Sequence, residues 1–278
     1  MKYELTNESM NNAAGRKLFR IKALVDIEEH GVKTGDLGGW IEKEKNLSPD
    51  GGAWVSGNAQ VYGDAQVYGD ACVYGDAKVS GAAKVSGDAQ VYDDACVFDD
   101  AKVYGAAKVY DDAKVYGAAK VFSNTEVSGN AKVYGNAKVY GNAWVYGNAK
   151  VYGNAKVYDD VDIYGNAQVY GNARVYGYAK ASGKTKVYGN TEVYGNAKMY
   201  GNAEVSCNAD YATINGFGTA YRPTTFFRCQ DSAVAVTCGC FYGTIDEFRE
   251  QVKRTRDGKV AAEYLKIADL MEYHFKED

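Results

Sequence analysis

Residues 131–136, Ala-Lys-Val-Tyr-Gly-Asn, show in its cleanest form a six-residue unit that fills the middle of the chain. Its valine position recurs at every sixth residue from Val55 to Val205, and all 26 of these positions are apolar. The residue two places earlier is small, and it is alanine in 22 of the 26 units. Because one short unit repeats over more than half of the chain, the sequence predicts a solenoid.

The order of residues within the unit indicates how each unit folds. Alanine and valine are two positions apart, and lysine and tyrosine occupy the alternate positions, which is the period of a short strand with one buried face. Glycine tolerates the positive φ of a corner, and Asn or Asp does so better than most other residues. One short strand and one corner in every unit predict an all-β solenoid, a parallel β-helix in which each coil pairs with the coils above and below.

The order Val-Tyr-Gly-Asn-Ala-Lys resembles the hexapeptide repeat of left-handed parallel β-helix proteins. In that family three hexapeptides make one coil, so the resemblance implies a left-handed, triangular helix with eighteen residues per coil. Residues 55–205 would then form about 8 coils, roughly 40 Å long at ~4.8 Å per coil. A right-handed, polymer-forming helix of the bacterial cytoskeletal type is the structural alternative.

The character of the sequence changes on both sides of the repeat, which divides the chain into residues 1–52, 53–210 and 211–278. The first part is expected to be an N-terminal β cap with an irregular first coil that begins near Trp40. Such a cap is needed because the last coil of a solenoid otherwise exposes its strand edges.

The C-terminal part is expected to be a small α+β module. Strands are expected near Phe226 and Val234, and Thr244 with Glu247 forms a capping-box pattern that starts a helix. A second helix is expected at about residues 260–275, where apolar residues follow one helical face. The module is either the second cap or a separate functional unit.

Two terminal segments carry a narrower resemblance. Residues 35–41, Gly-Asp-Leu-Gly-Gly-Trp-Ile, look like the opening segment of hexapeptide-repeat proteins encoded in phages and prophages. Residues 238–244, Cys-Gly-Cys-Phe-Tyr-Gly-Thr, look like the closing segment of the same group. The resemblance implies a phage or prophage setting, and it brings no assigned activity with it.

Charge and hydropathy limit the partners that we expect. The formal net charge of −4 gives no global attraction to nucleic acid or to anionic lipid. No apolar run is long enough to span a membrane, and the first residues contain no apolar signal region. We therefore expect a cytoplasmic protein, in the host cytoplasm if a phage encodes it, with neither a membrane nor nucleic acid as its partner.

The repeat lacks the groups that a catalytic site would need. Many left-handed β-helix proteins are acyl- or nucleotidyltransferases, and the acyltransferases among them share a histidine base and loops that interrupt the repeat. Here the only histidines, His30 and His274, lie outside the repeat, and no loop interrupts residues 55–205. The sequence therefore favours a non-enzymatic protein with no catalytic residue and no cofactor. A hexapeptide-repeat transferase with a displaced site is an alternative.

At eighteen residues per coil, one outward face carries a basic column beside an aromatic column. Charge and stacking would let these columns bind a polyanion or a nucleotide, and capture of small anionic nucleotides would counter host defence signalling. The alternative is that the columns solubilise and stiffen the sheet. The candidate binding residues on this face are Lys120, Lys138, Lys156, Arg174, Tyr140, Tyr158 and Tyr176.

Another outward face is mixed in charge and includes Trp54 and Trp144. A mixed, partly aromatic face is a better candidate for contact with a protein partner or with a second copy of the chain. Trp144 is the first candidate there, because tryptophan is enriched at the energetic centres of interfaces. The C-terminal module offers a further candidate site at Phe226, Phe227, Arg228 and Phe241.

Two acidic pairs are expected to stack at one corner of adjacent coils. Four carboxylates there would offer oxygen ligands to Ca²⁺. Aspartate is also a common turn residue that accepts hydrogen bonds from its own backbone. The two pairs are Asp93, Asp94, Asp111 and Asp112.

Three hypotheses for function follow from these features. The first is a rigid, non-enzymatic scaffold that binds a partner through the mixed face or the C-terminal module. The second is a protein that sequesters small anionic ligands, and the third is a transferase.

Overall fold

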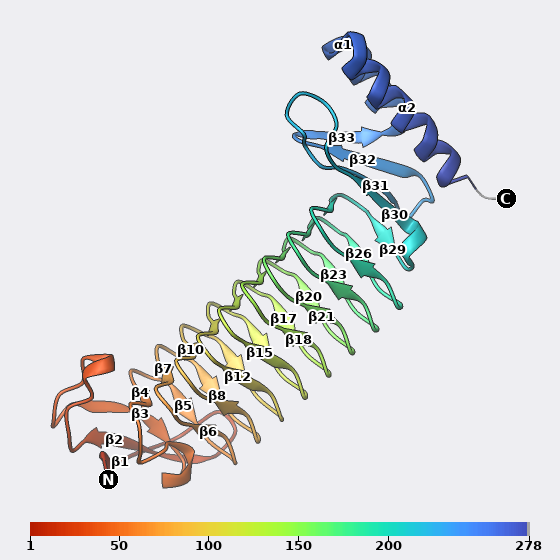
Figure 1. Ribbon diagram of the computed structural model, residues 1–278. Helices are drawn as coiled ribbons and strands as arrows, with labels where there is room; N and C mark the ends of the chain where they lie inside the picture. Colours follow the sequence, from red (N-terminus) through yellow and green to blue (C-terminus); the bar gives the residue numbers. More distant parts are fainter. Residues whose placement is uncertain (277–278) are drawn as a thin grey trace.

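The repeat units form a stack of short strands that wind around one core (Figure 1). The computed structural model describes residues 1–276. Each unit contributes a strand of two or three residues, which pairs in parallel with the strands eighteen residues away, as Val127 does with Val109 and Val145. The strands lie in three sheets of eight, nine and twelve strands, so the fold is a parallel β-solenoid of about nine coils.

The three sheets differ in the residues that they turn outward. The mixed sheet has nine strands: β4 (Trp54–Val55), β7 (Cys72–Val73), β10 (Gln90–Val91), β13 (Lys108–Val109), β16 (Glu126–Val127), β19 (Trp144–Val145), β22 (Asp162–Ile163), β25 (Lys180–Ala181) and β28 (Lys198–Met199). The basic sheet has eight: β6 (Gln66–Val67), β9 (Lys84–Val85), β12 (Lys102–Tyr104), β15 (Lys120–Phe122), β18 (Lys138–Val139), β21 (Lys156–Val157), β24 (Arg174–Val175) and β27 (Glu192–Val193). The long sheet contains β5 (Gln60–Val61), β8 (Lys78–Val79), β11 (Cys96–Val97), β14 (Lys114–Val115), β17 (Lys132–Val133), β20 (Lys150–Val151), β23 (Gln168–Val169), β26 (Lys186–Val187) and β29 (Glu204–Val205), together with three strands of the N-terminal cap.

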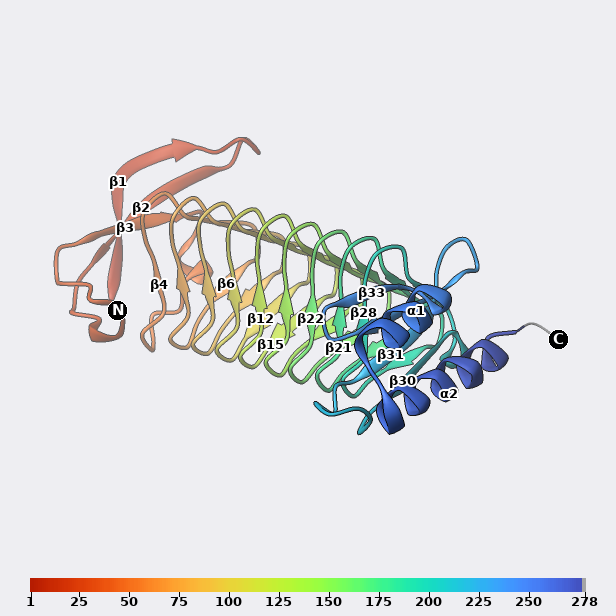
Figure 2. The same cartoon turned by 90° about the horizontal axis from the view of Figure 1, so that it is seen from above.

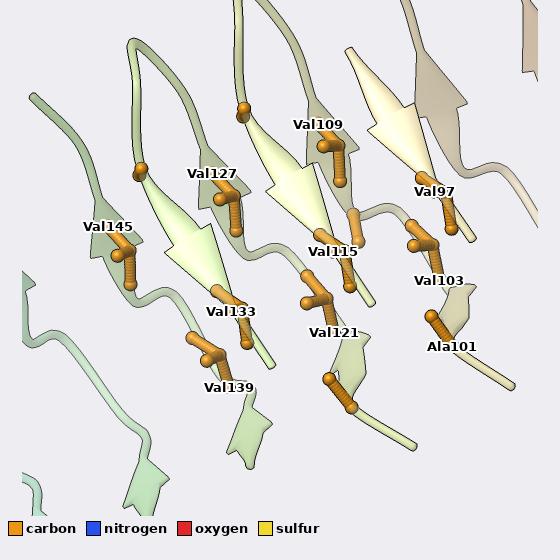
Figure 3. Packing of buried hydrophobic residues seen from close by; sticks show 14 of the residues in the cluster. Val97, Ala101, Val103, Val109, Val115, Val121, Val127, Val133, Val139 and Val145 are labelled. Atoms are coloured by element: carbon orange, nitrogen blue, oxygen red, sulfur yellow. The ribbon is translucent and has the colours of Figure 1, made fainter. Parts of the chain in front are cut away.

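The solenoid core is a stack of alanine and valine side chains from all three sheets. Figure 3 shows valines of successive coils, such as Val109, Val127 and Val145, lying one above another inside the coils, and these three side chains have no exposed surface. Where threonine replaces the small alanine, its hydroxyl donates to a backbone carbonyl, as Thr125 does to Phe122 at 2.8 Å. The narrow core thus accepts a polar atom where the backbone satisfies it.

The corners of the coils require positive φ, which glycine supplies in most units. Gly135, for example, has a φ of +69°, and a Cβ on it would lie 3.1 Å from the backbone nitrogen of Gly153 in the next coil. Corners of successive coils therefore stack closely. Glycine permits both the positive φ of the corner and the close approach of the next coil.

The N-terminal cap consists of β1 (Tyr3–Asn11), β2 (Lys17–Ala23) and β3 (Leu37–Ile41), with two 3₁₀ turns, η1 (Glu28–His30) and η2 (Glu44–Asn46). The first two strands form an antiparallel hairpin that projects beside the first coils (Figure 2). β3 is antiparallel to β2 but parallel to β5, where Trp40 pairs with Gln60, so the first coil begins at β3.

The C-terminal module contains one antiparallel sheet and two helices. Its strands are β30 (Tyr211–Ile214), β31 (Thr224–Arg228), β32 (Val234–Cys238) and β33 (Phe241–Thr244), preceded by η3 (Asn208–Asp210). Its helices are α1 (Ile245–Thr255) and α2 (Gly258–His274). The capping box of α1 is present, because the Thr244 hydroxyl accepts from the Glu247 N–H and the Glu247 carboxylate accepts from the Thr244 N–H.

The C-terminal sheet closes the end of the solenoid. Phe227 packs into the solenoid core, whereas its neighbour Phe226 packs against the helices on the other face. Thr225 accepts the Lys198 N–H at 3.0 Å, and the Thr237 hydroxyl donates to the Lys198 carbonyl at 2.8 Å. These bonds satisfy backbone groups of the last mixed-sheet strand, so the module is the second cap. Among residues 1–276, neither helix combines the length and the apolarity needed to cross a membrane.

Candidate functional site

The basic column lies on the basic sheet, where successive lysines occupy paired positions. Lys120 is paired with Lys138, and Lys138 with Lys156, with no acidic residue between them in the column. Within the part of the chain that the structure describes, these three lysines form no ion pair. Arg174 differs, because it lies 3.0 Å from the Glu192 carboxylate. The column is therefore an unneutralised row of cations that ends in an ion pair.

The aromatic column beside it is a continuous ladder of rings. Tyr140 and Tyr158 stack at 4.9 Å and Tyr158 and Tyr176 at 5.0 Å, with nearly parallel planes. Phe122 covers the outer face of Tyr140, and Tyr194 covers that of Tyr176. Both faces of the three predicted tyrosines are thus occupied by neighbouring rings. A base cannot stack on them, which removes the stacking part of the nucleotide hypothesis.

The ladder also protects the tyrosine hydroxyls from ionisation. Burial, followed by the charges of Tyr140 and Tyr176, raises the pKa of Tyr158 above its ordinary value. The raised pKa adds to the ordinary preference of a tyrosine hydroxyl for its neutral form at physiological pH, so the Tyr158 hydroxyl is a hydrogen-bonding group there.

Trp144 lies in the middle of the mixed sheet and is 50% exposed. Its neighbours in the adjacent coils are Glu126 and Asp162. Each of these carboxylates already has a partner, because Glu126 lies 3.7 Å from Lys108 and Asp162 pairs with Lys180. The tryptophan is therefore an exposed aromatic side chain between two ion pairs.

The tyrosine ladder of the mixed sheet is interrupted beside Trp144. Ser128 replaces the ring that would stand between Tyr110 and Tyr146. Tyr146 stacks on Tyr164 at 5.0 Å, and among residues 1–276 no aromatic ring stacks on its other face, which points toward Ser128. Trp144 and this open ring face together define the mixed-face site.

The other tryptophan of this face is not on the surface. Trp54 is 1% exposed and belongs to the core cluster that also contains Ile27 and Val32 of the N-terminal cap. Cys72 beside it is also buried, and burial raises the pKa of its thiol to about 11. The mixed face predicted from the sequence is therefore shorter in the structure, because its first two outward positions, Trp54 and Cys72, are buried.

The C-terminal residues predicted as a site act mainly in packing. Phe226 and Phe227 are fully buried, on opposite faces of β31. Arg228 donates to the Phe275 carbonyl at 2.9 Å and lies 3.5 Å from Asp210. The structure corrects the expectation for the two phenylalanines, since a fully buried ring cannot meet a ligand. Phe241 remains partly exposed.

The four aspartates act as corner residues. Asp93 and Asp111 both have a φ of 55°, in the corner position that glycine fills elsewhere. The Asp111 carboxylate accepts the N–H of Gly129 in the next coil at 2.9 Å. No group of three or more acidic, histidine or cysteine side chains within residues 1–276 is placed to hold a metal ion. The structure thus assigns the turn role to these aspartates in place of the suggested calcium site.

The two histidines lie in the two caps, at opposite ends of the molecule (Figure 1). His30 ends η1 in the N-terminal cap, and its Nε2 atom is buried without a hydrogen-bond partner among the described residues. His274 is exposed at the last turn of α2. Neither is near the faces of the central coils.

The fold and its surfaces define a β-solenoid repeat protein with capped ends. Comparison with protein families agrees: the family described as the YdcK beta solenoid repeat matches residues 65–81, 131–147 and 167–183, all within the solenoid. No curated protein matches the chain.

Proposed function

We propose that the chain is a non-enzymatic binding scaffold that holds a protein partner on its mixed face, centred on Trp144. The observation that carries this proposal is the half-exposed Trp144 side chain on a rigid sheet whose neighbouring charges are already paired. A tryptophan at such a position can bury a large apolar area against a partner without leaving a neighbouring charge buried and unpaired.

The surroundings of Trp144 support the same assignment. The backbone beneath it is bonded to the coils on both sides, with the Trp144 N–H donating to Val161 and the Glu126 N–H to Ala143. Because the scaffold is ordered before binding, little backbone entropy is lost when a partner docks. Beside the tryptophan, the coil that contains Glu126 has the small Ser128 side chain at the position where the adjacent coils have Tyr110 and Tyr146.

The setting of the protein forms a second part of the proposal. We place it in a phage or prophage and in the cytoplasm, on the support of residues 35–41 and 238–244, which resemble the terminal segments of phage-encoded repeat proteins. Residues 35–41 contain β3, and residues 238–244 run from the end of β32 through β33, so the two segments belong to the two caps.

The test compares the intact chain with Trp144→Ala and with Tyr178→Ala, all immobilised and exposed to an extract of the source cells. Tyr178 is a matched control because it is 61% exposed and lies at a corner, outside the strands of the mixed sheet. The partner should be retained by the intact chain and by Tyr178→Ala. Its affinity for Trp144→Ala should be lower by roughly 30-fold or more. Equal retention by both variants would refute the proposal.

A second candidate function is capture of an extended polyanion on Lys120, Lys138 and Lys156. The observation in its favour is that these cations have no ion-pair partner among the described residues. Binding of polyphosphate to the intact chain should weaken steeply with salt, and Lys138→Gln should reduce the salt dependence. Unchanged binding in Lys138→Gln would exclude the column as the site.

A further inference from the structure

The C-terminal module contains a pocket that neither the scaffold fold nor the mixed face explains. It has a volume of about 240 Å³ and lies between the end of β32, the start of β33, α1 and α2. Four separate segments converge on it, and the helices that form two of its walls pack on the face of the sheet that points away from the solenoid (Figure 1). The pocket is therefore built by the module alone.

Two arginines give the pocket a positive charge. Arg222 comes from the loop before β31, and Arg256 follows the last turn of α1. No acidic side chain is among the described residues that line the pocket, and neither arginine forms an ion pair within residues 1–276. Two guanidinium groups without an acidic partner in the lining of one pocket are suited to bind a carboxylate or a phosphate.

The position of Arg222 is set by the turn between β32 and β33. Gly239 there has a φ of +63°, and a Cβ on it would lie 2.8 Å from the Nη1 atom of Arg222. The guanidinium thus lies directly against the turn, at the edge of the pocket. On the other side, the Arg256 guanidinium donates to the Thr255 carbonyl at 2.9 Å, which holds it near the end of α1.

The floor of the pocket is aromatic and apolar. The Phe248 ring lies 5.5 Å from Phe241 and 5.8 Å from Tyr264, and Phe248 and Val252 are almost fully buried. The Tyr264 hydroxyl donates to the Phe217 carbonyl at 3.2 Å, so this ring is fixed.

The Tyr264 hydroxyl also reports on the charges around it. Burial and the neighbouring Cys238 raise the pKa of Tyr264, while the charges of Arg256 and Arg222 act in the opposite direction. Arg222, Arg256 and Tyr264 all line the pocket, so both guanidinium groups belong to the surroundings of this hydroxyl.

We propose that this pocket binds a small organic anion, with its phosphate or carboxylate between Arg222 and Arg256 and a ring-sized apolar group against Phe241. The volume limits the ligand, because pockets for drug-sized molecules usually occupy about 300–1,000 Å³. A single ring with one anionic group fits, and a nucleotide or a folded partner does not. The site is independent of Trp144, so either proposal can fail alone.

The experiment measures binding of phenyl phosphate, phenylacetate and inorganic phosphate to the full chain by calorimetry. We expect one of the two aromatic anions to bind saturably and more tightly than inorganic phosphate, and the comparison of the two identifies the anionic group. Arg222→Gln and Arg256→Gln should each weaken binding about tenfold or more, because each removes charge-assisted hydrogen bonds.

Lys253→Gln is the matched control, since Lys253 lies on the exposed side of α1 and pairs with Glu250 at 2.9 Å. It should leave the affinity unchanged. The proposal is overturned if neither aromatic anion binds, if inorganic phosphate binds as tightly as they do, or if Lys253→Gln weakens binding as much as the arginine variants. Far-ultraviolet circular dichroism of each variant confirms that it has folded.

Discussion

At the scale of single residues, the corners decide which side chains the solenoid accepts. Most corners contain glycine, but Asp93, Asp99, Asp111 and Asp159 have positive φ in the same position. Three of these carboxylates accept the corner N–H of the next coil, as Asp159 does from Gly177 at 3.1 Å. Aspartate therefore offsets the strain of its backbone conformation with a hydrogen bond, which alanine cannot make.

This difference predicts the outcome of two substitutions at one corner. Gly135→Ala should lower the free energy of unfolding by about 1–2 kcal/mol, because alanine is strained at positive φ. Gly135→Asp should lower it less, by about 1 kcal/mol, since its carboxylate can accept the Gly153 N–H. Chemical denaturation followed by circular dichroism measures both. The account is contradicted if the aspartate variant is as unstable as the alanine variant.

The narrow core makes a second prediction at this scale. Ala137 is fully buried, with Ala119 and Ala155 in the equivalent positions of the adjacent coils. Ala137→Leu should destabilise the chain by about 1–3 kcal/mol or more, because a close-packed core has no room for the added carbons. Lys138→Leu adds a leucine at the next, outward-facing position and should cost little. Equal loss in both variants would mean that the two positions are not on opposite faces.

At the scale of elements, the sequence predicts where strands and helices form better than it predicts which of their faces another part of the chain covers. The alternation in 131–136 and the capping box at Thr244 were sufficient to predict the strands and the start of α1, because both signals are local. The role of Phe226 and Phe227 could not be predicted in this way. Alternation places them on opposite faces of β31, but only the docking of the module determines that both faces are covered.

The pocket of the module was missed for a similar reason. Arg222 and Arg256 are separated in sequence by the whole of β31, β32, β33 and α1, and no motif links them. The one local signal is the Cys-Gly-Cys-Phe turn, which contains Gly239 and Phe241, and Gly239 lies against Arg222. Long-range packing brings the two arginines to one pocket, and no periodic pattern in the sequence predicts this.

Asp210 joins two elements, the last coil and the C-terminal sheet, and it makes that joint sensitive to acid. Burial alone would raise the pKa of Asp210, but hydrogen bonds from Ser206 and Cys207 outweigh it and lower the pKa below its ordinary value. The folded state thus binds this proton less readily than the unfolded state. Its contribution to stability is complete above about pH 4 and is lost as the pH falls through the folded-state pKa.

Asp210→Asn should therefore destabilise the chain at pH 7 by about 1–3 kcal/mol, because it weakens hydrogen bonds to a charged group. It should also reduce the loss of thermal stability between pH 6 and pH 3. Asp88→Asn, at an exposed corner, is the control and should leave the pH profile unchanged. Identical profiles for the parent chain and Asp210→Asn would show that this carboxylate does not set the acid response.

At the scale of the whole molecule, the two caps determine which parts of the repeat are available. The sequence placed Trp54 and Trp144 in equivalent positions of one face, and the strand register agrees, since both belong to the mixed sheet. The N-terminal cap then buries Trp54 and leaves Trp144 exposed. Periodicity predicts whether a side chain points inward or outward, but it does not predict which outward side chains a non-repeating segment covers.

The central claim is that solenoid and caps form one continuous scaffold, and hydrogen exchange measured by mass spectrometry tests it most directly. The Lys198 N–H, which donates to Thr225, should exchange as slowly as amides of the middle coils, and β31 should be protected to a similar degree. Replacing Thr225 and Thr237 with valine should speed exchange in β28 and β31 together. The claim is contradicted if β31 and β32 exchange rapidly while the solenoid stays protected, because the module would then be a separate unit.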